Sequence, residues 1–191
     1  MGISYIKICA LILAAGQGKR YGCPKIRAEI AGQLFAERII DSLQEAGITD
    51  YAIVVSNNDF EFATGRFDFE KLLMNHDPQS DMLASVKIGI KHCLDYAGVI
   101  IWPVDFPLVK PESLKLLVNS FRANPNQVIK PAFAERGGHP IVLPQGIFQT
   151  ILDSNSSSGL KEILHKGSFK IIHLPVDDPG SVENLNYPAV N

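Results

Sequence analysis

A glycine-rich, basic segment near the start of the chain has the residue types that bind polyphosphate. It follows an apolar run ending at Leu13 and reads Ala-Ala-Gly-Gln-Gly-Lys-Arg-Tyr-Gly-Cys-Pro-Lys over residues 14–25. Glycines let the backbone approach an anion closely, so exposed backbone N–H groups can donate to its oxygens. Arg20 and Lys25 add positive charge. We expect a phosphate-binding loop here; judged alone, the segment also fits a glycine-rich turn with solvated cations.

The spacing within this segment excludes two common phosphate-binding motifs. A P-loop requires Gly-Lys-Ser/Thr, which is absent. Gly16, Gly18 and Gly22 do not have the spacing of the dinucleotide-binding pattern Gly-x-Gly-x-x-Gly.

A single acid, Asp105, stands at the end of another apolar run, in Val-Ile-Ile-Trp-Pro-Val-Asp over residues 99–105. A buried carboxylate without a partner is costly, but it is useful where it holds a cation. Mg²⁺ usually takes one or two carboxylates together with phosphate oxygens and water. Asp105 is therefore either a Mg²⁺ ligand beside the phosphate loop or a turn and capping residue.

Alternating strand and helix patterns must position these residues. Short apolar runs bounded by Gly, Pro, Asn or Asp alternate with segments whose apolar residues recur every three to four positions. This alternation predicts an α/β fold: one Rossmann-like, three-layer α/β/α domain over residues 1–191, with a mostly parallel sheet covered on both faces. The predicted strands are Ile6–Leu13, Tyr51–Val55, Gly98–Val104, Val128–Lys130, Gly138–Leu143 and Phe169–Leu174, and the predicted helices are Leu34–Ala46, Phe69–Met74, Met82–Leu94, Pro111–Ala123 and Leu160–His165.

Composition limits the class of partner. The 191 residues are 46% hydrophobic and carry a formal net charge of −2, which gives no basic field for nucleic acid. Three scattered cysteines indicate neither a disulfide framework nor a zinc site. The apolar start continues into the basic loop, so we do not interpret it as a signal peptide, and no apolar run is long enough to span a membrane. We expect a cytoplasmic protein.

The loop resembles the Leu-x-Ala-Gly-x-Gly-x-Arg-x-Gly-x-x-Lys signature of nucleotidyltransferases that activate sugars, alcohols and molybdopterin. The resemblance implies a fold of the nucleotide-diphospho-sugar transferase type, in which this loop wraps a nucleoside triphosphate. It also implies catalytic roles for Arg20, near the outer phosphates, and for Lys25, near the reacting α-phosphate. The nucleotide-binding residues of the loop would be Leu13, Ala14, Ala15, Gly16, Gly18, Arg20 and Lys25.

Two further segments resemble the same group. Asp-Phe-Pro-Leu-Val from Asp105 is similar to its metal motif, which implies that Asp105 is catalytic and binds Mg²⁺. Asp-Met-Leu-Ala-Ser-Val-Lys-Ile-Gly-Ile over residues 81–90 is similar to a helix start that lies against the nucleotide, which implies a nucleotide contact for Ser85. Asn75 has the spacing of a strand-end asparagine that also contacts the nucleotide in this group.

The later segments resemble molybdopterin cytidylyltransferases and their close relatives. Gly-Gly-His-Pro-Ile-Val-Leu over residues 137–143 resembles an acceptor-binding segment, which implies that Gly138 and His139 contact the acceptor. Val-Asp-Asp-Pro-Gly over residues 176–180 precedes Asn184, implied to bind the acceptor, and Asn186, implied to bind the metal. Because these positions are asparagines, it stays open whether the metal is bound directly or through water.

Together these resemblances predict a Mg²⁺-dependent nucleotidyltransferase that transfers CMP from CTP to a molybdopterin-type acceptor and releases pyrophosphate. The Leu-Ala-Ala-Gly start of the loop favours CTP, since guanylyltransferases of molybdopterin usually have Leu-Ala-Gly-Gly. The alternatives are transfer to a sugar phosphate or another alcohol phosphate, and an inactive nucleotide-binding partner of a molybdoenzyme. A molybdoenzyme is a conceivable protein partner in either case.

Overall fold

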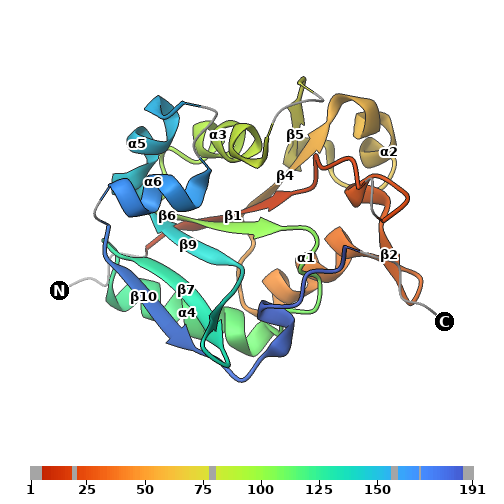
Figure 1. The fold of residues 1–191 in the computed structure, drawn as a ribbon. Helices are drawn as coiled ribbons and strands as arrows, with labels where there is room; N and C mark the ends of the chain where they lie inside the picture. Colours follow the sequence, from red (N-terminus) through yellow and green to blue (C-terminus); the bar gives the residue numbers. More distant parts are fainter. Residues whose placement is uncertain (1–5, 19–20, 78–80, 156–158, 168, 187–191) are drawn as a thin grey trace.

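The computed structural model of the chain describes residues 6–18, 21–77, 81–155, 159–167 and 169–186, and a mixed sheet runs through its middle (Figure 1). The strands lie in the order β10, β7, β9, β6, β1, β4, β5, with the short β8 paired to β7. Only β8 and β9 run antiparallel to their neighbours within this sheet, which confirms the predicted mostly parallel α/β fold. The strand bounds are β1 Ile8–Leu13, β4 Tyr51–Ser56, β5 Leu72–Asn75, β6 Gly98–Pro103, β7 Val128–Phe133, β8 Arg136–Gly137, β9 Ile141–Pro144 and β10 Ile171–Pro175.

Helices cover both faces of the sheet, as the sequence predicts (Figure 1). On one face α1 (Phe35–Glu45) and α4 (Pro111–Ala123) enclose a core that includes Trp102. On the other face α3 (Met82–His92), α5 (Phe148–Asp153) and α6 (Leu160–Lys166) enclose a second core around Leu11 and Val86. The short α2 (Phe60–Thr64) packs beside β4 and β5. In the described part of the chain, no helix has the length and apolar character needed to cross a membrane.

The central strand β1 explains why the site lies at one end of the sheet. All six of its residues are buried, because helices cover both of its faces. In its parallel pairing, Leu13 is opposite Val54 of β4 and Pro103 of β6. The backbone N–H of Val104 then donates to the Leu13 carbonyl at 3.1 Å. The loops that follow β1 and β6 therefore start side by side, at the carboxyl end of the sheet.

One predicted helix is wrong. Residues Phe69–Met74 do not form an α-helix: Phe69–Lys71 make a single 3-10 turn, and β5 follows, paired with β4. The apolar spacing of so short a run does not distinguish a helix from a strand. The parallel pairing with β4, a long-range contact, decides between them.

Other elements differ at their ends or were not anticipated. β7 continues to Phe133, and β9 starts at Ile141 instead of Gly138. α2 and α5 were not predicted, and neither was the hairpin of β2 (Glu29–Ile30) and β3 (Gln33–Leu34). Ala31 and Gly32 turn this hairpin with positive φ angles of 51° and 76°, and the alanine gives no turn signal in the sequence.

Residues 176–186 follow β10 and return over the carboxyl end of the sheet; we call them the C-terminal arm. Asp178 accepts from the backbone N–H of Lys110 at 2.8 Å, and Ser181 accepts from that of His139 at 2.7 Å. Further along, the backbone N–H of Leu185 donates to the Asp105 carbonyl at 2.8 Å. In Figure 1 the arm is the dark blue segment that leads from the end of β10 toward β2. The arm is thus fixed to two loops, the one between β6 and α4 and the one between β8 and β9.

Candidate active site

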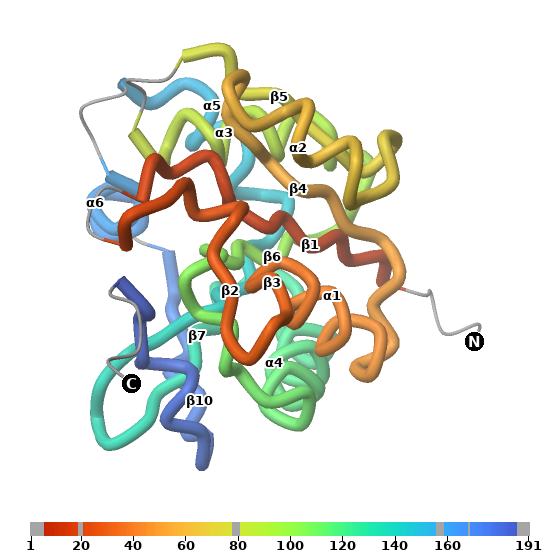
Figure 2. The backbone as a smooth tube through the Cα atoms, turned by 90° about the vertical axis from the view of Figure 1, so that its right-hand side faces the viewer, coloured from red at the N-terminus to blue at the C-terminus, as the bar shows by residue number. Residues whose placement is uncertain are grey.

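The loop after β1 folds back on itself and presents its first residues to a cavity. The carbonyl of Gly16 accepts from the backbone N–H of Lys25 at 3.0 Å, which closes the loop. Gly18 has a φ of +59°, and a Cβ atom there would lie 1.8 Å from the Cys23 carbonyl oxygen. Only glycine fits this position without strain. Figure 2 views the molecule from this end, with the loop in front of β1.

Lys25 stands at the centre of the site. Its side chain is only 12% exposed, and its Nζ donates to the Asp105 Oδ2 at 3.3 Å. The same nitrogen donates to the Leu185 carbonyl at 3.3 Å and to the Asn186 Oδ1 at 2.9 Å. One ammonium group thereby joins the loop after β1, the loop after β6 and the C-terminal arm.

Asp105 is also held by an amide group. Its side chain is 18% exposed, and its Oδ2 accepts from the Asn184 Nδ2 at 2.9 Å. Asn184 was predicted to bind the acceptor, and here it lies against this carboxylate. Asn186, the second predicted metal ligand, accepts from the Lys25 Nζ. The structure therefore brings Lys25, Asp105 and both asparagines together.

A cavity of about 180 Å³ lies beside this cluster, at the carboxyl ends of β1, β5 and β6. This is where open α/β sheets bind their ligands. Its lining includes seven of the residues that the sequence predicts for the site: Leu13, Ala15, Gly16, Lys25, Asn75, Ser85 and Asp105.

The other predicted residues of the loop lie elsewhere. Ala14 is buried in the core, and its backbone N–H donates to the Val54 carbonyl at 2.8 Å, so its side chain does not face the cavity. Gly18 shapes the loop without lining the cavity. Arg20 lies outside the described residues.

Asn75 and Ser85 form a buried pair that fixes one wall. The Asn75 Nδ2 donates to the Ser85 Oγ at 3.1 Å, which joins the end of β5 to the first turn of α3. Asp77 and Asp81 also line the cavity and were not predicted as site residues. Asp81 caps α3, accepting from the Ala84 N–H at 3.0 Å. A capping pattern was the only sequence signal for it.

His139 lies beside the site but is neutral at pH 7. Its ring packs against Phe106, with the centroids 4.7 Å apart. Burial, aided by the nearby charge of Lys130, lowers the pKa of His139 to about 4. Its buried Nδ1 has no hydrogen-bond partner among the described residues. Gly138 packs against the C-terminal arm, since a Cβ there would lie 2.1 Å from the Ser181 carbonyl oxygen.

The oxygen atoms around Lys25 fit a divalent cation. The Asp105 carboxylate, the Asn186 amide oxygen and the Leu185 carbonyl all accept from the Lys25 Nζ, and Mg²⁺ prefers oxygen ligands of these kinds. No group of three or more His, Cys, Asp or Glu residues gathers in the described part of the chain, at this site or at another. The protein would therefore supply part of the coordination, with phosphate oxygens and water completing it.

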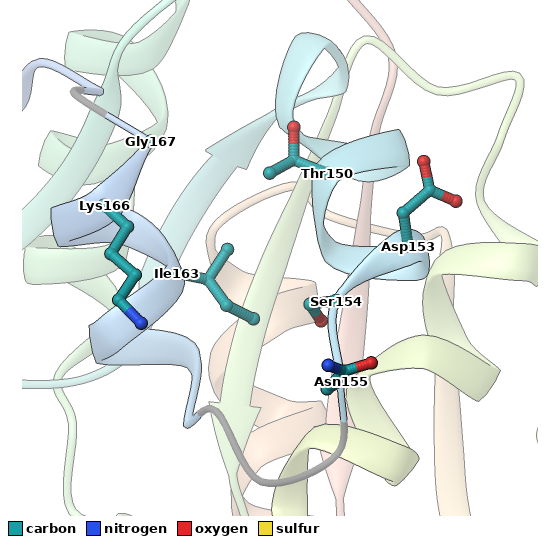
Figure 3. Close-up of a pocket in the computed structure, with 7 residues that line it drawn as sticks. All are labelled: Thr150, Asp153, Ser154, Asn155, Ile163, Lys166 and Gly167. Carbon is teal, nitrogen blue, oxygen red and sulfur yellow. The ribbon is translucent and has the colours of Figure 1, made fainter.

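A second, more open cavity of about 470 Å³ lies between α5 and α6 (Figure 3). Its charged residues have local partners: Lys166 pairs with Glu162 at 2.5 Å, and Asp153 accepts from the Gln149 Nε2 at 2.8 Å. None of the residues around Lys25 lines it, so it is not the candidate site. The residues drawn in Figure 3 are Thr150, Asp153, Ser154, Asn155, Ile163, Lys166 and Gly167.

Comparison with known proteins identifies the family of this chain. The family described as MobA-like NTP transferase domain matches residues 10–171. Bifunctional protein GlmU of Clostridium botulinum is 30% identical over 123 residues, which cover 59% of this chain and 25% of GlmU. A probable molybdenum cofactor guanylyltransferase of Natranaerobius thermophilus is 26% identical over 129 residues, covering 66% of this chain and 61% of that protein. The matched part is thus about a quarter of the first relative and about three fifths of the second.

Solved structures share the fold. Rv0371c from Mycobacterium tuberculosis H37Rv gives a TM-score of 0.81 at 18% identity, over 95% of this chain and 93% of that one. Its complex with manganese gives a TM-score of 0.73 at 17% identity, over 89% and 88% of the two chains. The predicted fold of the nucleotide-diphospho-sugar transferase type is confirmed.

Proposed function

The chain belongs to the MobA-like NTP transferase domain family, and we propose that it is a Mg²⁺-dependent enzyme that transfers CMP from CTP to a molybdopterin-type acceptor. The observation that carries this proposal is the convergence of Lys25, Asp105 and Asn186 beside the cavity. These residues come from three segments that are distant in the sequence. A structural role alone does not require a lysine, a carboxylate and an amide to meet at the ligand-binding end of the sheet.

The reaction needs no covalent enzyme intermediate. A phosphate monoester on the acceptor is largely a dianion at neutral pH, since its second pKa is about 6. One of its oxygens attacks the α-phosphorus of CTP, the bond from that phosphorus to the bridging oxygen breaks, and pyrophosphate leaves with the electron pair. The protein has to align the two reactants and neutralise the charge that develops.

Lys25 supplies positive charge at the α-phosphate, and the loop residues Ala15 and Gly16 approach the triphosphate closely. Lys25, Ala15 and Gly16 all line the cavity, which supports these roles. Asp105 and Asn186 would hold Mg²⁺, which would neutralise negative charge on the phosphates when bound. A related protein crystallised with manganese supports a divalent metal in this fold. Arg20 would contact the outer phosphates.

The choice of CTP rests on the Leu-Ala-Ala-Gly start of the loop. GTP is the main alternative, because relatives are named molybdenum cofactor guanylyltransferase. The same relatives support a molybdopterin-type acceptor. Asn75 and Ser85, whose pair forms the wall near α3, would contact the nucleoside. Gly138, His139 and Asn184 would contact the acceptor, since Asn184 donates to the Asp105 carboxylate and His139 packs on Phe106, the next residue.

Release of pyrophosphate tests the proposal. The purified protein is incubated with Mg²⁺ and each of CTP, GTP, ATP and UTP, against molybdopterin, a sugar 1-phosphate and an alcohol phosphate such as erythritol 4-phosphate. We expect release only with molybdopterin, and fastest with CTP. If pyrophosphate is released with another acceptor instead, that acceptor and not molybdopterin is the substrate. Nucleotide binding without release for any pair would favour a binding partner of a molybdoenzyme over an enzyme.

A further inference from the structure

Lys130 lies on β7 with its side chain half-buried on the face covered by α5 and α6. Val128 precedes it by two positions and contributes to the core on that face, so the two side chains point the same way. The end of the lysine side chain extends over Gly137 of β8. A Cβ atom on that glycine would lie 2.8 Å from the lysine Cε and 3.1 Å from its Nζ. Because residue 137 is a glycine, the Lys130 side chain can occupy this space.

The ammonium group of Lys130 has no anionic partner among the residues that the structure describes. The ion pairs of the described residues are Lys25–Asp105, Arg27–Asp59 and Lys166–Glu162, and no hydrogen bond from the Lys130 Nζ occurs among them. Burial, aided by the charge of Lys161, lowers the pKa of Lys130. A half-buried charge among like charges is costly, unless an anion binds there.

This group lies next to the candidate acceptor side of the site. The Lys130 Nζ lies over Gly137, two residues before His139, and the ring of His139 packs on Phe106, the residue after Asp105. The buried Nδ1 of His139 lacks a partner among the described residues. Two rings, those of Phe106 and His139, therefore lie between Asp105 and Lys130. The positive charge of Lys130 is not neutralised by any described residue.

We propose that Lys130, assisted by Lys161, binds an anionic group of the acceptor and so selects acceptors that carry negative charge on this side of the site. The inference rests on the proposed transfer reaction and adds a binding residue to it. The anionic group is either the reacting phosphate or a second anion on the same acceptor. The neutral ring of His139 contributes a hydrogen bond beside it.

Steady-state kinetics of the Lys130→Ala variant test the proposal. Losing one charge-assisted contact raises the KM for the acceptor about 10–100-fold, while kcat and the KM for the nucleotide stay near wild type. Lys130→Arg restores most of the affinity. Lys170→Ala is the matched control, since Lys170 is an exposed lysine just before β10 and its loss changes the net charge equally. Equal acceptor KM values for Lys130→Ala and Lys170→Ala would overturn the proposal.

Direct binding separates this inference from the transfer activity. Inorganic phosphate is titrated into the protein without nucleotide while the ring resonances of His139 are followed by NMR. We expect a saturable shift in the wild type that disappears in Lys130→Ala and persists in Lys170→Ala. A saturable, Lys130-dependent shift supports the anion site even if no pyrophosphate is released with any substrate pair. Absence of the shift in the wild type overturns it. In kinetics, an acceptor with one phosphate distinguishes the two anion sources: if Lys130→Ala affects it as strongly as an acceptor with a second anion, the reacting phosphate is bound.

Discussion

Replacing Lys25 by alanine tests the proposed chemistry most directly. Its Nζ lies 3.3 Å from the Asp105 carboxylate, 3.3 Å from the Leu185 carbonyl and 2.9 Å from the Asn186 amide oxygen. If this ammonium stabilises charge at the α-phosphate, its removal lowers kcat about 10²–10³-fold, as for other preorganised electrostatic groups. Nucleotide affinity falls much less, because the loop backbone and the metal still bind the phosphates.

The same contacts predict a separate loss of stability. The side chains of Lys25 and Asp105 are 12% and 18% exposed, so their interaction is only weakly screened by solvent. Asp105 keeps its bond from Asn184, and the free energy of unfolding should fall by about 1–3 kcal/mol. Such a loss leaves the protein folded at 25 °C, where catalysis can be measured.

The assay combines initial rates of pyrophosphate release with equilibrium binding of the nucleotide, so that kcat and affinity are read separately. Lys115→Ala, an exposed lysine on α4, serves as the control for charge. A Lys25→Ala protein that is folded, binds the nucleotide and keeps wild-type kcat would refute a role for this ammonium in the reaction.

Three further predictions follow from individual residues. Asp105→Asn should raise the Mg²⁺ concentration needed for half-maximal activity and lower kcat at least about 10²-fold, and an unchanged Mg²⁺ requirement would exclude Asp105 as a ligand. The pKa of His139 is about 4 when folded and ordinarily 6.5, so the unfolded chain binds more protons between these values. The stability it contributes is present above pH 6.5 and falls by up to about 3 kcal/mol toward pH 4, and urea unfolding of wild type and His139→Gln against pH checks this; equal pH dependence of the two contradicts it. Gly18→Ala should raise the nucleotide KM and lower the melting temperature, because its Cβ would meet the Cys23 carbonyl at 1.8 Å, whereas Gly146→Ala, with open space around it, should change neither.

The local parts of the site could be predicted from the sequence. The glycines and cations of residues 14–25 and the acid after an apolar strand are short-range patterns, and both are where the sequence indicates. Parallel strands then bring the two loops together, because the carboxyl ends of β1 and β6 must coincide. Asn184 and Asn186 of the C-terminal arm were also predicted, through the resemblance to molybdopterin cytidylyltransferases.

The contacts that depend on long-range pairing could not be predicted. Residues 72–75 form β5 only because β4 offers an open edge for pairing, which no local pattern reports. That Asn184 lies on the Asp105 carboxylate follows from the path of the C-terminal arm. Lys130 looks like an ordinary strand lysine in the sequence. Its lack of a partner becomes visible only when Gly137 and His139 are placed beside it.

The C-terminal arm also determines when the candidate site is completed during folding. Lys25 and Asn186 are 161 residues apart, and Asp105 and Asn184 are 79 apart. Contacts at such separation form late, because the closure entropy of the intervening chain has to be offset first. During synthesis, β1, β4 and β6 emerge and can pair long before the arm leaves the ribosome. A nascent chain can therefore pair these strands while Lys25 and Asp105 still lack the asparagines, and the site is assembled only after the arm has been translated.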